Sequence, residues 1–186
     1  MILTDREIRI SIERKLIEID PAPGADAFSS TAVDLTLDGP FRLYKERSQS
    51  LDHIVDPGRP GFSIKEAIDT LTVQKEIDSS GFSLEPGNLI LAWTRESVNL
   101  KTESRVAARV EGKSSLARLG LLVHLTAPTI HAGFSRPIQL EVINLGKVPI
   151  RLRVGMPICQ LILEQTLGVA DQGYAGRFAK QGAASL

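Results

Sequence analysis

One short segment, residues 112–120, combines the residue types that hold phosphate groups in proteins. It reads Gly-Lys-Ser-Ser-Leu-Ala-Arg-Leu-Gly, so a lysine, two adjacent hydroxyls and an arginine follow one another closely. Hydroxyls and backbone N–H groups donate to phosphate oxygens, and an arginine can donate two parallel hydrogen bonds. If Ser114 begins a short helical turn, the free N–H groups of that turn would also bind phosphate. The Walker spacing G-x-x-x-x-G-K-[ST] is absent, so the segment alone favours an ordinary polar turn over a phosphate site.

A second segment, residues 137–143, alternates between apolar and polar residues as a half-buried strand does. Its even-numbered residues are apolar and would face the core, whereas Gln139 and Glu141 would face the other way. An amide and a carboxylate side by side on one strand face can bind a flat polar ring and move its protons. A single strand glutamate is also commonly a solvated residue, so the alternation leaves both interpretations open.

The composition is that of an ordinary globular protein. The 186 residues are 42% hydrophobic and 24% charged, which suits a single domain, residues 1–186, with an ample core. The formal net charge is zero, so we expect no DNA or RNA partner and no membrane surface. No apolar run is long enough to span a bilayer, and the first residues lack the apolar region of a secretion signal. We therefore expect a cytoplasmic protein.

Two helices are predicted from capping patterns. Thr4 and Glu7 form a capping box, and apolar residues every four positions to Leu16 predict a short N-terminal amphipathic helix. A second capping box at Ser63 predicts a short helix to about Leu71. A third helical turn is expected at 114–119.

The remaining pattern is mainly β. Short alternating segments separated by turn residues predict an all-β barrel or sandwich. The expected strands are Thr31–Leu37, Leu89–Thr94, Val106–Val110, Leu121–Leu125, Pro137–Ile143, Val148–Val154 and Ile158–Glu164. Asp34 would face outward from the first of them. The only cysteine, Cys159, lies in an apolar run and is predicted to be a buried structural thiol.

Several motifs, in order along nearly the whole chain, resemble the dCTP deaminase branch of the dUTPase superfamily. The motifs that carry the resemblance are GKSSLARLGL at 112–121, TA at 126–127, IHAGF at 130–134 and QLE at 139–141. The opening MILTDREI, the segment AVDLTL at 32–37 and the pairs GM at 155–156 and QL at 160–161 add to it. The resemblance implies a dUTPase-like distorted β-barrel or jelly roll with a short N-terminal helix and few other helical turns.

The resemblance also implies an activity, the conversion of dCTP to dUTP and ammonia in the supply of dUMP and dTTP. Deaminases that use zinc carry a His/Cys ligand set with a P-C-x-x-C signature. The chain has three histidines, His53, His124 and His131, and one cysteine, which do not form such a set at any recognisable spacing. We therefore expect deamination without zinc, with Mg²⁺ bound through the triphosphate of the substrate. His124, between two apolar strand residues, is predicted to be structural.

The family pattern assigns roles to individual residues of this chain. Glu141 would take a proton from water and pass it to the base, Ser114 and the backbone at 125–127 would hold that water, and Arg118 would stabilise charge and help to fix Glu141. Lys113 and Ser115 would face the triphosphate, Gln139 and Leu140 would bind the base edge through backbone groups, and Asp34 would help to organise the site near the magnesium. The implied substrate-binding residues are Lys113, Ser114, Ser115, Leu116, Ala117, Arg118, Thr126, Ala127, His131, Gln139, Leu140, Glu141, Tyr174, Arg177 and Gln181.

The tail, residues 171–186, is rich in glycine and alanine, which predicts a flexible C-terminus. It resembles the tails that close over the nucleotide in this family, with Tyr174, Arg177 and Gln181 as the contacting residues. The glycine-rich last motif of typical dUTPases is absent, which favours the deaminase branch.

Two positions depart from the family pattern. His131 stands where these enzymes carry an aspartate, which in dUTPases contacts the sugar hydroxyl and activates the attacking water. Pro128 stands where a histidine or glycine is usual, and this affects the shape of the base pocket. We hypothesise that pyrophosphate hydrolysis is weak or lost while deamination survives; the alternative is that His131 fills a turn in a weakly active relative.

Other functions remain open at this stage. The protein could be a bifunctional enzyme that converts dCTP to dUMP, a dUTP diphosphatase, or a nucleotide-sensing relative without turnover. The resemblance implies a homotrimer with sites shared between subunits, and dTTP as an inhibitor.

Overall fold

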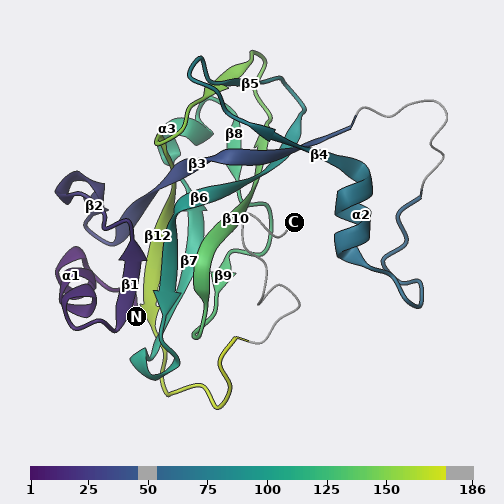
Figure 1. The fold of residues 1–186 in the computed structure, drawn as a ribbon. Helices are drawn as coiled ribbons and strands as arrows, with labels where there is room; N and C mark the ends of the chain where they lie inside the picture. Colours follow the sequence, from purple (N-terminus) through teal and green to yellow (C-terminus); the bar gives the residue numbers. More distant parts are fainter. Residues whose placement is uncertain (46–53, 175–186) are drawn as a thin grey trace.

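The computed structural model describes residues 1–45 and 54–174, and the chain folds mainly into β-strands (Figure 1). In chain order the elements are α1 (Asp5–Glu13), β1 (Ile17–Asp20), β2 (Phe28–Ser29), β3 (Ala32–Tyr44), α2 (Ile64–Leu71), β4 (Thr72–Glu76), β5 (Phe82–Leu84), β6 (Leu89–Leu100), β7 (Val106–Gly112), α3 (Ser114–Ala117), β8 (Leu121–Val123), β9 (Thr129–Ile130), β10 (Ser135–Asn144), β11 (Ile150–Leu152) and β12 (Pro157–Gln165), with short 3₁₀ turns at Ala25–Ala27 and Thr102–Ser104. The mainly β prediction is confirmed.

Ten of the strands form one sheet. Its main path runs β8-β10-β6-β3-β12-β7-β9, with β1 beside β6 and with β2 and β4 beside β3, while β5 and β11 form a separate pair. The pairings within this sheet are antiparallel. The sheet curls around its own core, α1 lies beside β1, and α2 stands away from the sheet at the ends of β3 and β4 (Figure 1).

The core forms where alternate residues of the long strands face inward. Ile138, Leu140 and Val142 of β10 are at most 2% exposed, as the alternation predicts. Their neighbours Gln139 and Glu141 are only partly buried and face away from the core. Cys159 is buried, and burial, with smaller contributions from the charges of Glu96 and Asp34, raises the pKa of its thiol. It is therefore a structural residue, as predicted.

The two predicted capping boxes have different outcomes. The Ser63 hydroxyl accepts the Glu66 N–H at 3.3 Å and α2 ends at Leu71, so the second is confirmed. Thr4 is the N-cap residue of α1, but its side chain makes no capping hydrogen bond. The helix also ends at Glu13, short of Leu16, because Lys15 adopts a left-handed φ of 55° that a helix does not accommodate.

The structure extends some predicted strands and shortens others. β3 and β6 continue well past Leu37 and Thr94, and β1, β4, β5 and β9 were not predicted. The strand expected at Leu121–Leu125 stops at Val123, because His124 has a left-handed φ of 68°. This turn moves His124 out of the strand and toward β10.

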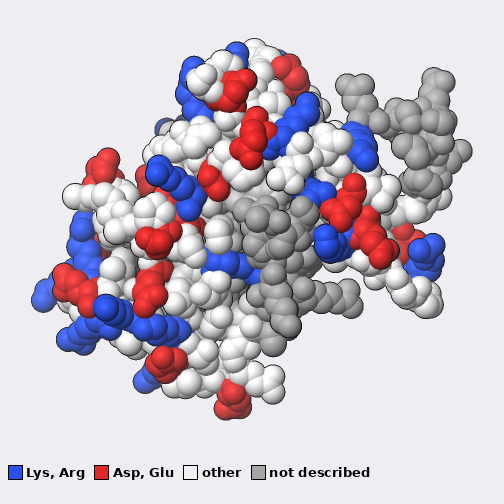
Figure 2. Space-filling model, viewed as in Figure 1, with Lys and Arg blue, Asp and Glu red and all other residues white. Residues whose placement is uncertain are grey.

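Acidic and basic side chains are interspersed over the face of the molecule seen in Figure 2. Among the described residues, no helix has the length and apolar character that crossing a membrane requires.

Candidate active site

A cavity of about 460 Å³ lies on the face of β10 that points away from the core. It is bounded by β10, β6, α2, the segment after β8 and the hairpin between β9 and β10. Its lining residues include Tyr44, Ile64, Ile68, Leu91, Trp93, His124, Ala127, Thr129, His131, Phe134, Arg136, Gln139, Glu141 and Tyr174. Across the β10–β6 pair, Gln139 lies opposite Trp93 and Glu141 lies opposite Leu91, so two polar groups sit beside a largely apolar floor.

A register shift in the sheet helps to form this surface. The pairing of β10 with β6 shifts between Pro137 and Gln139, next to a proline that lacks an N–H group. The Ile138 N–H donates instead to the Thr94 hydroxyl at 2.9 Å. Such irregularities redirect side chains and are frequent beside active sites.

Glu141 has an ionisable neighbour in His124. His124 Nδ1 lies 3.3 Å from Glu141 Oε2, and the histidine side chain is 7% exposed while that of Glu141 is 32% exposed. The two atoms lie within ion-pair distance, but they are not aligned as a hydrogen bond, since His124 Nδ1 has no hydrogen-bond partner among the described residues. On the other side of the ring, Nε2 lies 2.7 Å from the Ala127 carbonyl oxygen. The ring thus connects Glu141 to the segment that was predicted to hold water.

Tyr44 contributes a second polar group to the cavity. Burial, and to a lesser extent the negative charge of Glu141, raise the pKa of the Tyr44 hydroxyl. It therefore stays protonated near neutral pH and can donate a hydrogen bond into the cavity.

One backbone edge of β10 is available beside Glu141. β8 pairs with Val142–Asn144 only, and the Glu141 carbonyl oxygen accepts the His124 N–H at 2.8 Å. No described strand covers the preceding residues on that edge. Leu140 is fully buried and does not line the cavity with its side chain, so only its backbone could contact a ligand.

The start of the tail packs against the hairpin that carries His131. The Tyr174 N–H donates to the Ala132 carbonyl oxygen at 3.0 Å, and its ring stacks on His131 with centroids 5.6 Å apart. The Arg136 guanidinium lies 4.8 Å from the centre of the Phe134 ring and 5.3 Å from that of Tyr174. Tyr174 is therefore part of the cavity wall, whereas Arg177 and Gln181 lie outside the described residues.

The predicted phosphate-binding segment lies elsewhere on the chain. Ser114 begins the short helix α3, as predicted, and the Arg118 N–H donates to the Ser114 carbonyl oxygen at 3.2 Å. Lys113 pairs with Asp34, whose other carboxylate oxygen accepts the Gln160 amide at 3.0 Å. Ser114, Ser115, Ala117 and Arg118 are exposed. In Figure 1, α3 lies at the end of the molecule where β5 and β8 lie, apart from α2.

The structure thus divides the predicted site residues into two groups. Ala127, His131, Gln139, Glu141 and Tyr174 line the cavity. The residues from Lys113 to Arg118, and Thr126, do not line it. Within one chain, His124 rather than Arg118 is therefore the ionisable neighbour of Glu141.

Comparison with known proteins decides the family. The family model described as dCTP deaminase-like matches residues 2–166. The chain belongs to the dCTP deaminase-like family. The dCTP deaminase of Shewanella frigidimarina is 40% identical over 179 residues, covering 95% of this chain and 90% of the relative. That of Shewanella oneidensis is 39% identical over 181 residues, with the same coverage.

Solved structures agree on the fold of this dCTP deaminase-like chain. A 2′-deoxycytidine 5′-triphosphate deaminase from Agrobacterium tumefaciens matches 88% of the chain with a TM-score of 0.66 and 22% identity. The match covers 48% of that protein, so the present chain spans about half of its length. A dUTPase variant of Staphylococcus bacteriophage 80alpha matches with a TM-score of 0.51 and 9% identity, over 86% of this chain and 96% of the phage protein. The predicted dUTPase-like fold is confirmed.

The sequence did not identify several residues of the cavity. Tyr44 and Arg136 were not considered, Trp93 carried no signal of a site, and His124 was assigned a structural role. Each lies on a different element or at a turn, and only the pairing of β3, β6, β8 and β10 brings them together. The one available signal was His124 itself, two residues before the Thr126-Ala127 motif of the dCTP deaminase-like family.

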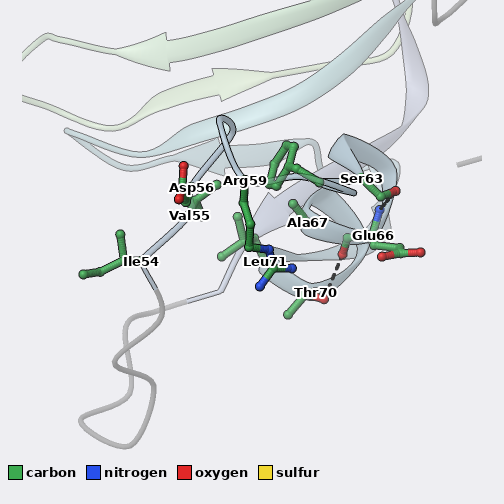
Figure 3. Close-up of a pocket in the computed structure, with 10 residues that line it drawn as sticks. Ile54, Val55, Asp56, Arg59, Ser63, Glu66, Ala67, Thr70 and Leu71 are labelled. Carbon is green, nitrogen blue, oxygen red and sulfur yellow. Dashed lines mark hydrogen bonds between the residues drawn. The ribbon is translucent and has the colours of Figure 1, made fainter.

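A second cavity, of about 360 Å³, lies between α2 and the segment 54–62. Figure 3 shows Arg59 from the loop beside Ala67, Thr70 and Leu71 of the helix, with Thr70 Oγ1 donating to the Glu66 carbonyl oxygen. None of the residues that the dCTP deaminase-like motifs single out lines it. Of these two cavities, only the one at Glu141 contains residues of those motifs among its described lining residues.

Proposed function

We propose that this protein is a dCTP deaminase that converts dCTP and water to dUTP and ammonia. The observation that carries the proposal is Glu141, which lies in the cavity beside His124 and two residues from Gln139. Membership of the dCTP deaminase-like family supports the same substrate. A cytoplasmic location fits this activity and stays a prediction.

The proposed chemistry needs one acid–base group at C4 of the base. Glu141 accepts a proton from a water molecule as the water oxygen attacks C4, and passes it to N3, which generates a tetrahedral intermediate. A second proton transfer to the amine lets ammonia leave and restores the C4 carbonyl, so the carboxylate ends the cycle as it began. The Ala127 backbone, to which the His124 ring lies close, positions the water together with Ser114 supplied by a second copy of the chain. No zinc takes part in this mechanism.

The separation of the two residue groups favours a site completed by a second copy of the chain. Among the described residues, the cavity is lined by Glu141 but by no lysine and no residue of 113–118, while Ser114, Ser115 and Arg118 are exposed on the same chain. A neighbouring subunit could place its own segment 113–118 over the cavity. This arrangement supports the proposed homotrimer with shared sites, which a mass measurement in solution would test.

Magnesium would be carried by the nucleotide. In the described residues no three His, Cys, Asp or Glu side chains gather as metal ligands do, and the Asp34 carboxylate already binds Lys113 and Gln160. These contacts fit a cation held by phosphate oxygens, with Asp34 orienting Lys113 toward them. Bound Mg²⁺ would neutralise phosphate charge and leave the reaction at C4 to Glu141.

A second candidate is continued reaction of dUTP to dUMP, or dUTP hydrolysis alone. His131 disfavours both, because an imidazole ring replaces the negatively charged carboxylate that, in the dUTPases the sequence resembles, contacts the sugar hydroxyl and the attacking water. A nucleotide-sensing protein without turnover is disfavoured by the exposed, unblocked Ser114 and by the placement of Glu141. Binding of dTTP as an inhibitor stays a prediction from the resemblance.

The test is incubation with dCTP and Mg²⁺ while ammonia and nucleotides are both followed. We expect ammonia and dUTP in equal amounts, and a loss of about two to four orders of magnitude in rate for Glu141→Gln. Glu103→Gln, at an exposed position, is the matched control. Pyrophosphate with dUMP would indicate the second candidate, and tight dCTP binding without product would indicate the sensing protein.

A further inference from the structure

The side-chain amide of Gln139 is an unused hydrogen-bond donor in the cavity wall. Gln139 lines the cavity, and its Nε2 atom is shielded from water and has no hydrogen-bond partner among the described residues. A shielded amide donor without an acceptor destabilises a protein. A residue of this kind at a binding site points to an acceptor that the ligand supplies.

The position of Gln139 relative to Glu141 limits which ligand atom can accept the hydrogen bond from Gln139 Nε2. The two residues lie on the same face of β10, about 7 Å apart along the strand. Trp93 lies directly across from Gln139 on β6 and provides an apolar surface beside it. A single six-membered ring can therefore contact both the amide and the carboxylate.

We propose that Gln139 Nε2 donates a hydrogen bond to the carbonyl O2 of the pyrimidine base. This inference rests on the proposed function, in which Glu141 acts at C4 and N3. The cytosine ring offers two acceptors, N3 and O2, and the first is engaged by Glu141. The remaining acceptor, O2, lies on the same edge of the ring as the C4 amine, on the other side of N3, where a donor two residues along the strand can meet it.

This role is one of specificity and binding. O2 is a carbonyl oxygen in both cytosine and uracil, and its charge changes little as water adds at C4. The hydrogen bond therefore stabilises substrate and transition state alike, so its removal raises KM and leaves kcat nearly unchanged. It also selects for pyrimidines that carry an acceptor at position 2.

The first test replaces the amide by an apolar chain of similar length, Gln139→Met. We expect KM for dCTP to rise about three- to tenfold, the worth of one hydrogen bond, with kcat within about twofold. The melting temperature should stay the same or rise, because an unpaired donor is removed. Gln74→Met, at an exposed position on β4, is the control and should change neither. A lower kcat at unchanged KM, or a lower melting temperature, would overturn the proposal.

The second test identifies the atom with the 2-thio analogue of dCTP, whose sulfur is a poor acceptor. With this analogue, the KM of the wild-type protein should rise by about the same factor as the KM of Gln139→Met rises with dCTP. The KM of Gln139→Met should not rise further when dCTP is replaced by the analogue. An equal rise in KM with the 2-thio analogue in both proteins would overturn the assignment to O2. A rise in KM with 2′,3′-dideoxy-CTP that occurs in the wild type but not in Gln139→Met would also overturn it. Absence of any dCTP deamination by the wild type would refute the proposed function itself.

Discussion

His124 Nδ1 lies 3.3 Å from the Glu141 carboxylate, and this contact joins two segments of the chain that the sheet brings together. β8 pairs with β10 up to Val123 and Val142, and the left-handed turn at His124 places the imidazole beside the carboxylate. The histidine that the sequence assigned to structure therefore lies beside the proposed acid–base group, and we expect it to orient that carboxylate.

His124→Gln should reduce kcat for dCTP deamination by about tenfold to a hundredfold, because Glu141 and the Ala127 backbone lose the ring that lies between them. Steady-state assays with ammonia detection would measure this. Thermal unfolding of the same variant separates the effect from misfolding. A kcat within twofold of the wild type would show that the contact has no part in the reaction.

His131→Asp should raise dUTP hydrolysis by about tenfold or more, because it restores the negatively charged carboxylate that the family pattern places at the attacking water. Pyrophosphate release from dUTP is the measurement. His131→Asn, which removes the ring without adding charge, is the control. Unchanged dUTP hydrolysis in His131→Asp would contradict the hypothesis that His131, in place of the family aspartate, weakens pyrophosphate hydrolysis.

Gly133→Ala should weaken substrate binding by displacing the start of the tail. Gly133 has a φ of +86°, and an added Cβ would lie 2.7 Å from the Tyr174 nitrogen. Gly155→Ala is the matched control, since Gly155 has a φ of +78° and no atom lies within 4 Å of an added Cβ. Both variants should be less stable by about 1–2 kcal/mol from the left-handed backbone alone. Only Gly133→Ala should raise KM for dCTP; equal KM values in the two variants would contradict a role for Tyr174.

Asp69 should make the stability of the α2 region sensitive to acid. A hydrogen bond from Lys65, and a further one from Arg42, lower the pKa of the Asp69 carboxyl. A lowered folded-state pKa adds stability above the unfolded pKa, about 3.9, and that stability is lost as the pH falls through the folded value.

The measurement for Asp69 is the melting temperature at pH 7 and at about pH 3. Asp69→Asn should lower the value at pH 7, where Arg42, which is 7% exposed, loses its charged partner. It should have less effect at about pH 3, because the stability contributed by the carboxylate falls as the pH drops below the unfolded pKa toward the lowered folded value. An equal effect of the substitution at both pH values would contradict the role assigned to this ion pair.

Several local features followed from the sequence because their causes are local. The Ser63 capping box predicted α2, the alternation of 137–143 predicted which residues of β10 face the core, and the serine pair predicted a helical turn at Ser114. Thr4 is the N-cap residue of α1 but makes no side-chain capping bond, and the left-handed residue Lys15 ends the helix before Leu16. The four residues of β1 alternate but are few, and β9 has only two residues; both form strands only where a partner strand lies beside them.

By itself, the sequence determined the family, the mainly β fold and the face of the strand that carries Gln139 and Glu141, because motif order and periodicity are properties of the chain alone. Only the tertiary structure decided that His124, Tyr44 and Trp93 meet at Glu141, and that the segment 113–118 lies outside the cavity of its own chain. The physical reason is that alternation specifies which side of a strand is buried, whereas strand order and register depend on pairings between segments distant in sequence.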